Sequence, residues 1–456
     1  MKPIRIPAAL LLVLLLLAGC ASTETTAPTE TENLETIAPT FPEVMDVTDS
    51  VSTPEAYLAL AEEHPETHFI WSVPFSFGPT ASDTQLLEAS SMDESDLLLM
   101  QYLTELTELD LSRCTNWPLV KQCLDSFTGL QIRYSVPLGE QYFSMDHAEE
   151  ITLQNASHEE LMENLPFLPF VSSIQLAGTL PDTEALLELK ETFPHITFLW
   201  EFDFLGIPVN TMTESIDLSG TEITDTRELE TMLPFFYRLS SVDMCDCGLD
   251  NETMAALNER HPGTQFVWKV KVGKVVARTD AIYFMPAKFG VSWMLQEQTE
   301  NLKYLTRLQV LDLGHYSGIS DVSFLYNMPD LRVLSLNSAV CADFTPIGAC
   351  QNLEYFEVFL GRGKDLWPLV NCTSLKNLNI SFMPYGDPLP LCQMTWLDRL
   401  WICGNRLSEE ECEMIRQALP NTVIVFDSDS STAKGWRHSP SYYWARDIVD
   451  MIYMTR

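Results

Sequence analysis

Basic residues are scarce in this sequence. Its 456 residues include 27 Lys and Arg against 64 Asp and Glu, which gives a formal net charge of −37 at pH 7. A surface this acidic repels nucleic acid, anionic lipid and anionic wall polymers. We therefore expect no nucleic-acid partner. Weak binding of divalent cations or of a basic partner remains open, and so does the simpler interpretation that acidity keeps the protein soluble.

Motifs of common enzymes are also absent. No G-x-S-x-G, H-E-x-x-H or P-loop pattern occurs, nor a G-x-G-x-x-G in the context that dinucleotide binding needs. The stretch Cys245-Asp246-Cys247 lacks the second Cys or His pair that zinc requires at a recognisable spacing. We expect a non-enzymatic protein with no catalytic residues, no metal and no cofactor.

The amino end begins with a short apolar stretch. Two cations precede the run from Ile6 to Leu17, which is too short to span a bilayer comfortably as a permanent helix. The small residues at positions 18 and 19 suit the pocket of a signal peptidase. This arrangement predicts an export signal over residues 1–19.

Cys20 completes this signal. The sequence Leu17-Ala18-Gly19-Cys20 resembles the lipobox of bacterial lipoproteins, in which the Cys thiol receives a diacylglycerol and becomes the first residue of the mature chain. The resemblance implies lipidation of Cys20 and a location on the outer face of the bacterial cytoplasmic membrane, or on an outer membrane if the source has one. An ordinary secretory signal is the alternative. Residues 20–52 are rich in Thr, Glu and Pro, which predicts a lipid-anchored, disordered tether.

A short apolar motif recurs through the carboxy-terminal half. Its copies read LQVLDL, LRVLSL, LEYFEV, LKNLNI and LDRLWI, and their last residues lie 23, 22, 22 and 22 positions apart. Each copy follows Leu-x-x-Leu-x-Leu, with Phe, Val or Ile allowed. The last copy continues with Asn405 and Leu407 to give L-x-x-L-x-L-x-x-N-x-L, which resembles the leucine-rich repeat family.

The amino-terminal half carries the same frame less regularly, as LTELDLSRCTNW at 106–117 and LSSVDMCDCGL at 239–249. Four octets also recur there and at the last strand: HPETHFIW, FPHITFLW, HPGTQFVW and LPNTVIVF. Each follows a short amphipathic helix. Because Pro cannot continue a helix and favours extended backbone before it, each octet is interpreted as a helix-to-strand corner. Glycines at 78, 139, 206 and 273 close the extended strands that follow.

These repeats predict the fold class and the organisation of the chain. Units of about 22 residues, as in the leucine-rich repeat family, predict one continuous α/β solenoid. The resemblance implies a horseshoe with a parallel concave sheet and with helices or 3₁₀ turns on the convex side. We expect irregular repeats with extended hairpin strands over 53–300, regular 22-residue repeats over 301–427, and a carboxy-terminal cap over 428–456. Trp436, Tyr442, Tyr443 and Trp444 could instead serve a separate binding role.

Ten cysteines follow Cys20, and an exported chain with that number invites disulfides. Cys350 and Cys372 lie one period apart just before their strands, so a bridge between them is possible. Most of the cysteines, however, occupy positions of the repeat core. This placement favours buried free thiols that behave as small hydrophobic side chains.

One residue of each predicted strand lies between two inward-facing apolar residues and therefore faces the concave side. These residues are Asp110, Gln175, Asp217, Asp243, Asp312, Ser335, Glu357, Asn379 and Trp401, and neighbouring columns add Glu108, Tyr355, Phe359 and Arg399. The family resemblance implies that the concave sheet is the ligand surface. A column of carboxylates there would attract a basic or polyamine-like partner. The alternative is that the carboxylates only keep an exposed sheet soluble.

Aromatic residues dominate binding energies where they are exposed, so Tyr355, Phe359 and Trp401 are the expected hot spot. The leading hypothesis is a cell-surface lipoprotein that recognises a protein or glycan through its concave face and contacts the membrane only through its lipid anchor, and a basic partner is left open. A scaffold within an envelope complex is the second hypothesis, and an envelope hydrolase is a weaker third. The sequence does not indicate an oligomeric state.

Overall fold

The computed structural model describes residues 42–438, 440, 442–444, 446 and 447. The chain forms two compact units, Met1–Phe202 and Asp203–Arg456. The predicted signal peptide and the lipidation site Cys20 lie outside the described residues.

Short parallel strands, most of them preceded by a helix, build the first unit. Its helices are α1 (Pro54–Glu63), α2 (Glu94–Leu99), α3 (Trp117–Ser126), α4 (His158–Asn164) and α5 (Thr183–Thr192). Its strands are β1 (Val44–Asp46), β2 (His68–Ile70), β3 (Ser72–Phe75), β4 (Gly78–Ala81), β5 (Leu86–Glu88), β6 (Glu108–Leu111), β7 (Gln131–Leu138), β8 (Gln141–Ser144), β9 (Ile151–Gln154), β10 (Ser173–Ala177) and β11 (Thr197–Leu199). Four sheets result, with strand orders β1-β2, β3-β4, β5-β6-β7-β8 and β11-β10-β9.

The fold begins earlier than the sequence predicts. Residues 42–52 were expected to belong to the disordered tether. Instead, β1 pairs in parallel with β2, and Val47 and Val51 are buried. The burial of these apolar side chains offsets the conformational entropy that the backbone loses, so the segment is ordered here.

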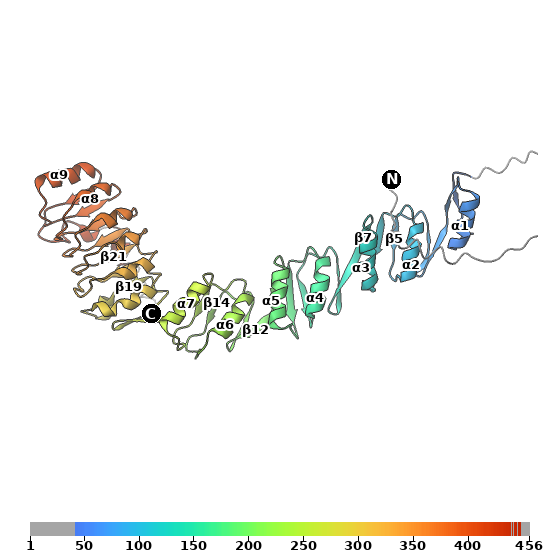
Figure 1. The fold of residues 1–456 in the computed structure, drawn as a ribbon, viewed down its shortest axis with the longest axis horizontal. Helices are drawn as coiled ribbons and strands as arrows, with labels where there is room; N and C mark the ends of the chain where they lie inside the picture. The colour runs from blue at the N-terminus through green and yellow to red at the C-terminus, as the bar shows by residue number, and fades with distance from the viewer. Residues whose placement is uncertain (1–41, 439, 441, 445, 448–456) are drawn as a thin grey trace, which may run out of the picture. The chain divides into compact units, whose positions relative to one another are not determined.

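The second unit contains the regular repeats. After the strand pair β12 (Glu201–Phe204) and β13 (Ile207–Asn210) come β14 (Ser215–Asp217), β15 (Ser241–Asp243) and β16 (Gln265–Val267), then the hairpin β17 (Lys269–Val272) and β18 (Val275–Arg278). Seven parallel strands then follow in chain order, drawn from yellow to red in Figure 1: β19 (Tyr283–Phe284), β20 (Val310–Asp312), β21 (Val333–Ser335), β22 (Tyr355–Glu357), β23 (Asn377–Asn379), β24 (Arg399–Trp401) and β25 (Val423–Val425). The α-helices are α6 (Arg227–Met232), α7 (Asn251–Arg260), α8 (Leu389–Gln393) and α9 (Glu409–Ala418).

The four predicted helix-to-strand corners are confirmed. Helices α1, α5, α7 and α9 end just before the octets and lead into β2, β11, β16 and β25. Each helix starts at a side-chain cap, such as Asp182, whose carboxylate accepts a hydrogen bond from the Ala185 N–H at 2.9 Å. Because Thr, Asp or Ser at this position satisfies a free N–H of the first turn, the sequence sets where each helix begins.

The parallel ladder is broken into several sheets, whereas the sequence predicts one continuous sheet. The pairs β3–β4, β7–β8 and β17–β18 are antiparallel hairpins, and they lie between the parallel groups. Gly139 and Gly273 lie in two of the hairpin turns with a φ of 59°, a left-handed conformation that favours glycine. In β7, Gln131–Tyr134 pair in parallel with β6 and Ser135–Leu138 pair antiparallel with β8, so the pairing changes along one strand.

The Phe of an octet strand pairs with the first inward residue of the preceding strand. Phe266 pairs with Val242, and Phe198 likewise pairs with Ile174. Trp268 takes the next inward position and is 5% exposed. Side chains alternate with a period of two along a strand, so the Phe and the Trp of an octet both lie in the core.

From β20 to β23, each repeat is short because its return segment is a 3₁₀ turn rather than a long helix. The segment ISDVSFLYNMPDL contains the 3₁₀ helix η8 (Ser323–Asn327), and Ile319, Val322, Leu325 and Leu331 are buried. The equivalent turns are η9 (Ile347–Ala349) and η10 (Trp367–Asn371). One continuous core of leucine-type side chains results.

Removal of one core side chain should destabilise this unit strongly. Leu378 is fully buried in β23, and Leu378→Ala should lower the free energy of unfolding by roughly 2–5 kcal/mol because it leaves a cavity. Leu389 is 48% exposed, so Leu389→Ala should cost less than about 0.5 kcal/mol. Urea unfolding followed by circular dichroism measures both. Equal losses would contradict a shared core at Leu378.

Candidate functional site

The strongest candidate site is the face of β20–β24 that lies opposite the leucine core, named here the concave face. Two rows of residues in register form it. One row is Val310, Val333, Tyr355, Asn377 and Arg399, and the other is Asp312, Ser335, Glu357, Asn379 and Trp401. The second row is the predicted concave column, so its alignment across these five repeats is confirmed.

This face is not open to solvent. Strands β21, β22 and β23 are buried on both sides, whereas β6, β14 and β15 are fully buried on only one. The cover is the segment that follows the last repeat, residues 431–447, named here the tail segment. Trp436 is fully buried, and its ring centroid lies 5.2 Å from that of Tyr355 and 5.1 Å from that of Trp401.

The predicted exposed hot spot is therefore corrected. Tyr355 is 1% exposed, Trp401 2%, Glu357 2% and Phe359 8%. The tail segment covers Tyr355, Glu357 and Trp401, while the ring of Phe359 lies edge-on to His315. The alternation of a strand indicates which side chains leave the core, but it cannot indicate that another segment returns to cover them.

The tail segment also differs from the predicted end cap. It lies on the concave face, and Tyr442 and Trp444 pack against the same apolar cluster as Trp436. Tyr443 is 46% exposed. Val423 in the last strand is 59% exposed, so the described residues do not cover the open edge of the sheet there. The aromatic residues of the tail segment thus cover the concave face of the repeats rather than their end.

Glu357 is the polar centre of the concave face. Its carboxylate accepts hydrogen bonds from the Tyr355 hydroxyl at 2.6 Å and from Asn337 Nδ2 at 3.0 Å. Arg437 of the tail segment completes the arrangement, with its Nη2 3.1 Å from Glu357 Oε1. Burial raises the pKa of the Tyr355 hydroxyl well above its usual value, so this group remains a hydrogen-bond donor. A buried carboxylate with three such partners is well suited to hold a cation.

Three side chains of the face bind main-chain carbonyls of the tail segment. Asn379 Nδ2 donates to the Ser431 carbonyl at 2.7 Å, and Trp401 Nε1 donates to the Ala433 carbonyl at 3.0 Å. The guanidinium of Arg399 donates to the Gly435 carbonyl and lies over the Trp436 ring. The sequence does not predict these contacts. One signal in it is that the predicted column changes from carboxylates to aromatic and amide residues in these repeats.

The predicted acidic column has a structural explanation in most of its members. At the end of the strand, each Asp accepts a hydrogen bond from the N–H two residues later, at 2.9 Å in all four cases: Asp110 from Ser112, Asp217 from Ser219, Asp243 from Cys245, and Asp312 from Gly314. Asn379 repeats this contact with Ser381 at 3.1 Å. Short polar side chains stabilise turns in this way. An Asp followed two positions later by a small residue (Ser, Gly or Cys) is the signal in the sequence.

These carboxylates do not form one acidic stripe. Asp110 lies in the first unit, in register with Glu88 and Arg133. Asp217 is exposed, and its neighbour Asp243 forms an ion pair with Arg278 at 2.6 Å. Asp312 is largely covered. The column is therefore partly neutralised and partly buried, and only Asp217 and Asp243 occupy neighbouring strands.

Asp312 and Asp217 should respond oppositely to replacement. Burial raises the pKa of Asp312; the charge of Glu357 raises it further, and the charge of Arg437 lowers it. Hydrogen bonds from Ser219 lower the pKa of the exposed Asp217. The ionised Asp312 therefore lowers stability as pH rises above its usual pKa. Asp312→Asn keeps the acceptor for Gly314 and should raise the melting temperature at pH 7 more than at pH 4.

Asp217→Asn is the matched control, and it should lower the melting temperature slightly at pH 7 because it removes a carboxylate that the folded chain favours in its charged form. Thermal melts at the two pH values measure both variants. A lower melting temperature of Asp312→Asn at pH 7 would show that the Asp312 charge is used in the fold.

The ten described cysteines are all free thiols, eight of them buried. Cys350 Sγ contacts backbone carbonyls of its own and the preceding repeat, and Cys372 Sγ lies 3.3 Å from the Ile347 carbonyl. Burial raises the pKa of both thiols to about 12, so neither is a reactive thiolate. The interpretation as small core side chains agrees with these contacts.

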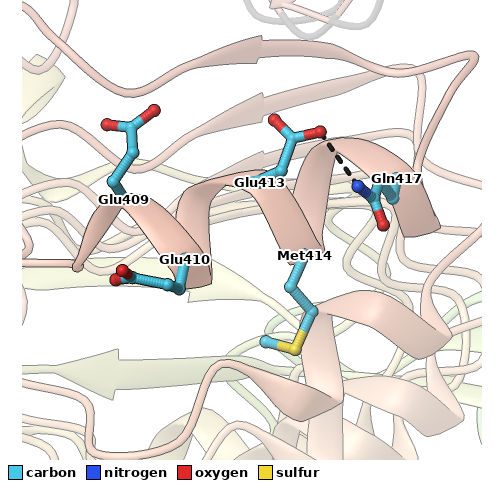
Figure 2. A pocket seen from close by; sticks show the side chains of 5 residues that line it. All are labelled: Glu409, Glu410, Glu413, Met414 and Gln417. Carbon is cyan, nitrogen blue, oxygen red and sulfur yellow. Dashed lines mark hydrogen bonds between the residues drawn. The ribbon is translucent and has the colours of Figure 1, made fainter.

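Enclosed sites for chemistry are not evident in the described part of the chain. The hollow in Figure 2 is lined by Glu409, Glu410, Glu413, Met414 and Gln417, all of which belong to α9, so no second element forms an opposing wall. Glu413 accepts a hydrogen bond from Gln417 at 3.0 Å there. No group of three or more potential metal ligands occurs among the described residues. None of the described helices has both the length and the apolar composition needed to cross a bilayer.

Several solved leucine-rich repeat structures resemble this chain at low identity. Internalin C2 from Listeria monocytogenes is 21% identical over 32% of this chain and 72% of its own, with a TM-score of 0.25. Another internalin from the same organism is 17% identical over 82% and 88%, with a TM-score of 0.27. A leucine-rich repeat protein from Leptospira interrogans is 13% identical over 81% and 98%, with a TM-score of 0.23.

TM-scores this low do not establish a shared overall shape. The leucine-rich repeat architecture follows instead from the repeat spacing and from the register of the parallel strands. No protein-family model and no curated protein sequence matches the chain.

Proposed function

We propose that this protein is a lipid-anchored, non-enzymatic recognition protein of the bacterial surface that binds a protein partner through the concave face. The observation that supports the proposal is that this face holds a polypeptide segment from outside the repeats. Residues of β22, β23 and β24 contact the tail segment through an aromatic cluster, an ion pair and three hydrogen bonds to main-chain carbonyls.

The chemistry of the face favours a protein over a small molecule. Tyr355 and Trp401 are large aromatic anchors, the kind of residue that dominates protein interfaces. Asn379 and Arg399 supply donors for backbone carbonyls, which every polypeptide presents. A wide sheet face without an enclosing wall suits such a partner better than a compact ligand.

The proposed location depends on the amino-terminal sequence. The lipobox-like residues before Cys20 favour diacylglyceryl transfer, and two acyl chains anchor a protein far more firmly than one. The ordered repeats start within about 25 residues of Cys20, because β1 begins at Val44. The tether between Cys20 and the first ordered strand would thus be short.

Replacement of the lipidated cysteine tests this location. Cys20→Ser should abolish incorporation of a clickable palmitate analogue, because the thiol that accepts the lipid is lost. The variant should also move from the membrane fraction to the soluble fraction after cell lysis. Cys412→Ser, a partly exposed thiol of the folded region, is the control and should keep both label and location. Persistent labelling of Cys20→Ser would refute the anchor.

Capture from the native envelope tests the role of the concave face. The mature wild type is compared with Tyr355→Ala/Trp401→Ala and with the control Trp367→Ala/Leu389→Ala, whose side chains are 49% and 48% exposed in the return segments of their repeats. Loss of hot-spot aromatics costs about 2 kcal/mol or more, so the first variant should recover the partner at least about tenfold less well. The control should behave as wild type.

Circular dichroism and thermal melts establish that each bait is folded. Equal recovery of the same proteins by all three baits would place recognition on another surface and would favour the scaffold hypothesis.

A further inference from the structure

The tail segment is a basic stretch of a strongly acidic chain. Among residues 431–447, the cations Lys434, Arg437 and Arg446 outnumber the single acid Asp447. Arg437 pairs with Glu357, the most deeply buried carboxylate of the concave face. The charge of the segment is thus complementary to the surface that it covers, as expected of a ligand.

The concave face recognises the backbone of the segment independently of its sequence. The carbonyls that it binds belong to Ser431, Ala433 and Gly435, which alternate along the chain. All three donors are side chains of β23 and β24 rather than backbone groups. The segment does not extend the sheet, so its release would break no strand pairing.

The concave face recognises the side chains of the segment at two positions. The ring of Trp436 packs between Tyr355 and Trp401, beneath the Arg399 guanidinium. The next residue, Arg437, places its guanidinium on Glu357. Adjacent sites for an aromatic ring and for a cation therefore select an aromatic residue followed by a basic one.

The occupant does not satisfy the site completely. Trp436 is fully buried, yet its Nε1 donor has no hydrogen-bond partner among the described residues. A buried donor without a partner weakens the association that contains it. The link to β25 crosses Asp429 and Ser430, which are exposed, so the segment can leave without unfolding a repeat.

We propose that the tail segment is an intramolecular ligand that occupies the partner-binding face, and that the partner displaces it with a segment of the same chemistry, an aromatic residue followed by arginine or lysine. The inference rests on the function proposed above. The unliganded protein is then held in a closed state, and the apparent affinity for the partner is reduced by the fraction of molecules that are closed.

Exchange of the segment tests this inference in the full mature chain. The variant Trp436→Ala/Arg437→Glu removes the ring and places a second carboxylate beside Glu357, so the segment should leave the face. The probe is a fluorescent peptide with the wild-type sequence of residues 428–447. By fluorescence anisotropy, the variant should bind it at least tenfold more tightly than wild type, in which the site is occupied.

A matched control also replaces one aromatic residue and one arginine, at exposed positions of the segment. Tyr443→Ala/Arg446→Glu should leave the face covered and bind the peptide as weakly as wild type, because both side chains are exposed. A peptide that itself carries Trp436→Ala and Arg437→Glu should lose at least tenfold in affinity for the opened variant.

Three results would overturn the inference. The first is an opened variant that unfolds cooperatively but binds the peptide no better than wild type. The second is equal binding of the wild-type and doubly substituted peptides. The third is a wild-type dimer in light scattering that dissociates in the opened variant, since the segment would then belong to a second copy.

The peptide assay requires no partner, so it separates this inference from the proposed function. Peptide binding by the opened variant, without capture of any partner, would support the intramolecular ligand and contradict the proposed recognition of a protein partner. Capture that depends on Tyr355 and Trp401, combined with no peptide exchange, would contradict only the inference.

Discussion

One-sided burial of the repeat strands is the constraint on which the rest of the structure depends. Leu311, Leu334, Phe356, Leu378 and Leu400 lie in register on one side of the sheet and are all fully buried. Side chains alternate along a strand, so the ladder that builds this core also creates a second face. Parallel sheets are normally covered on both faces. The side of each repeat that faces away from the core must therefore be either polar or covered by another segment.

The chain deals with that second face in two ways. In β6, β14 and β15 the outward positions are polar and remain accessible to water. In β21, β22 and β23 both sides are buried, because Trp436 and its neighbours lie over them. The covered rows contain aromatic, amide and hydroxyl residues. Without the cover, the aromatic side chains would form an exposed apolar patch. Cover and face therefore form one unit, and its polar centre is Glu357.

The carboxylates show how one residue type can serve unlike purposes. At strand ends, Asp217 and Asp312 both hold a turn through the N–H two residues later, yet one is exposed and the other is largely covered. Glu357 instead bridges the sheet and the tail segment. A large negative charge thus does not by itself mark a binding surface. Only carboxylates that form no ion pair within the protein can attract a basic partner. Asp243, one of the residues predicted to do so, is paired with Arg278.

The sequence by itself determined the features that depend on local chemistry. Caps such as Asp182, prolines after helices, glycines in hairpin turns and the leucine spacing act within a few residues, so helices, corners, repeat length and core positions could be predicted. Tertiary structure alone decided which outward residues meet solvent. Trp436 follows Tyr355 by about 80 residues, and no periodicity encodes a contact between a repeat and a segment outside the repeats. Only folding brings the two together, because the apolar area that they bury is shared between them.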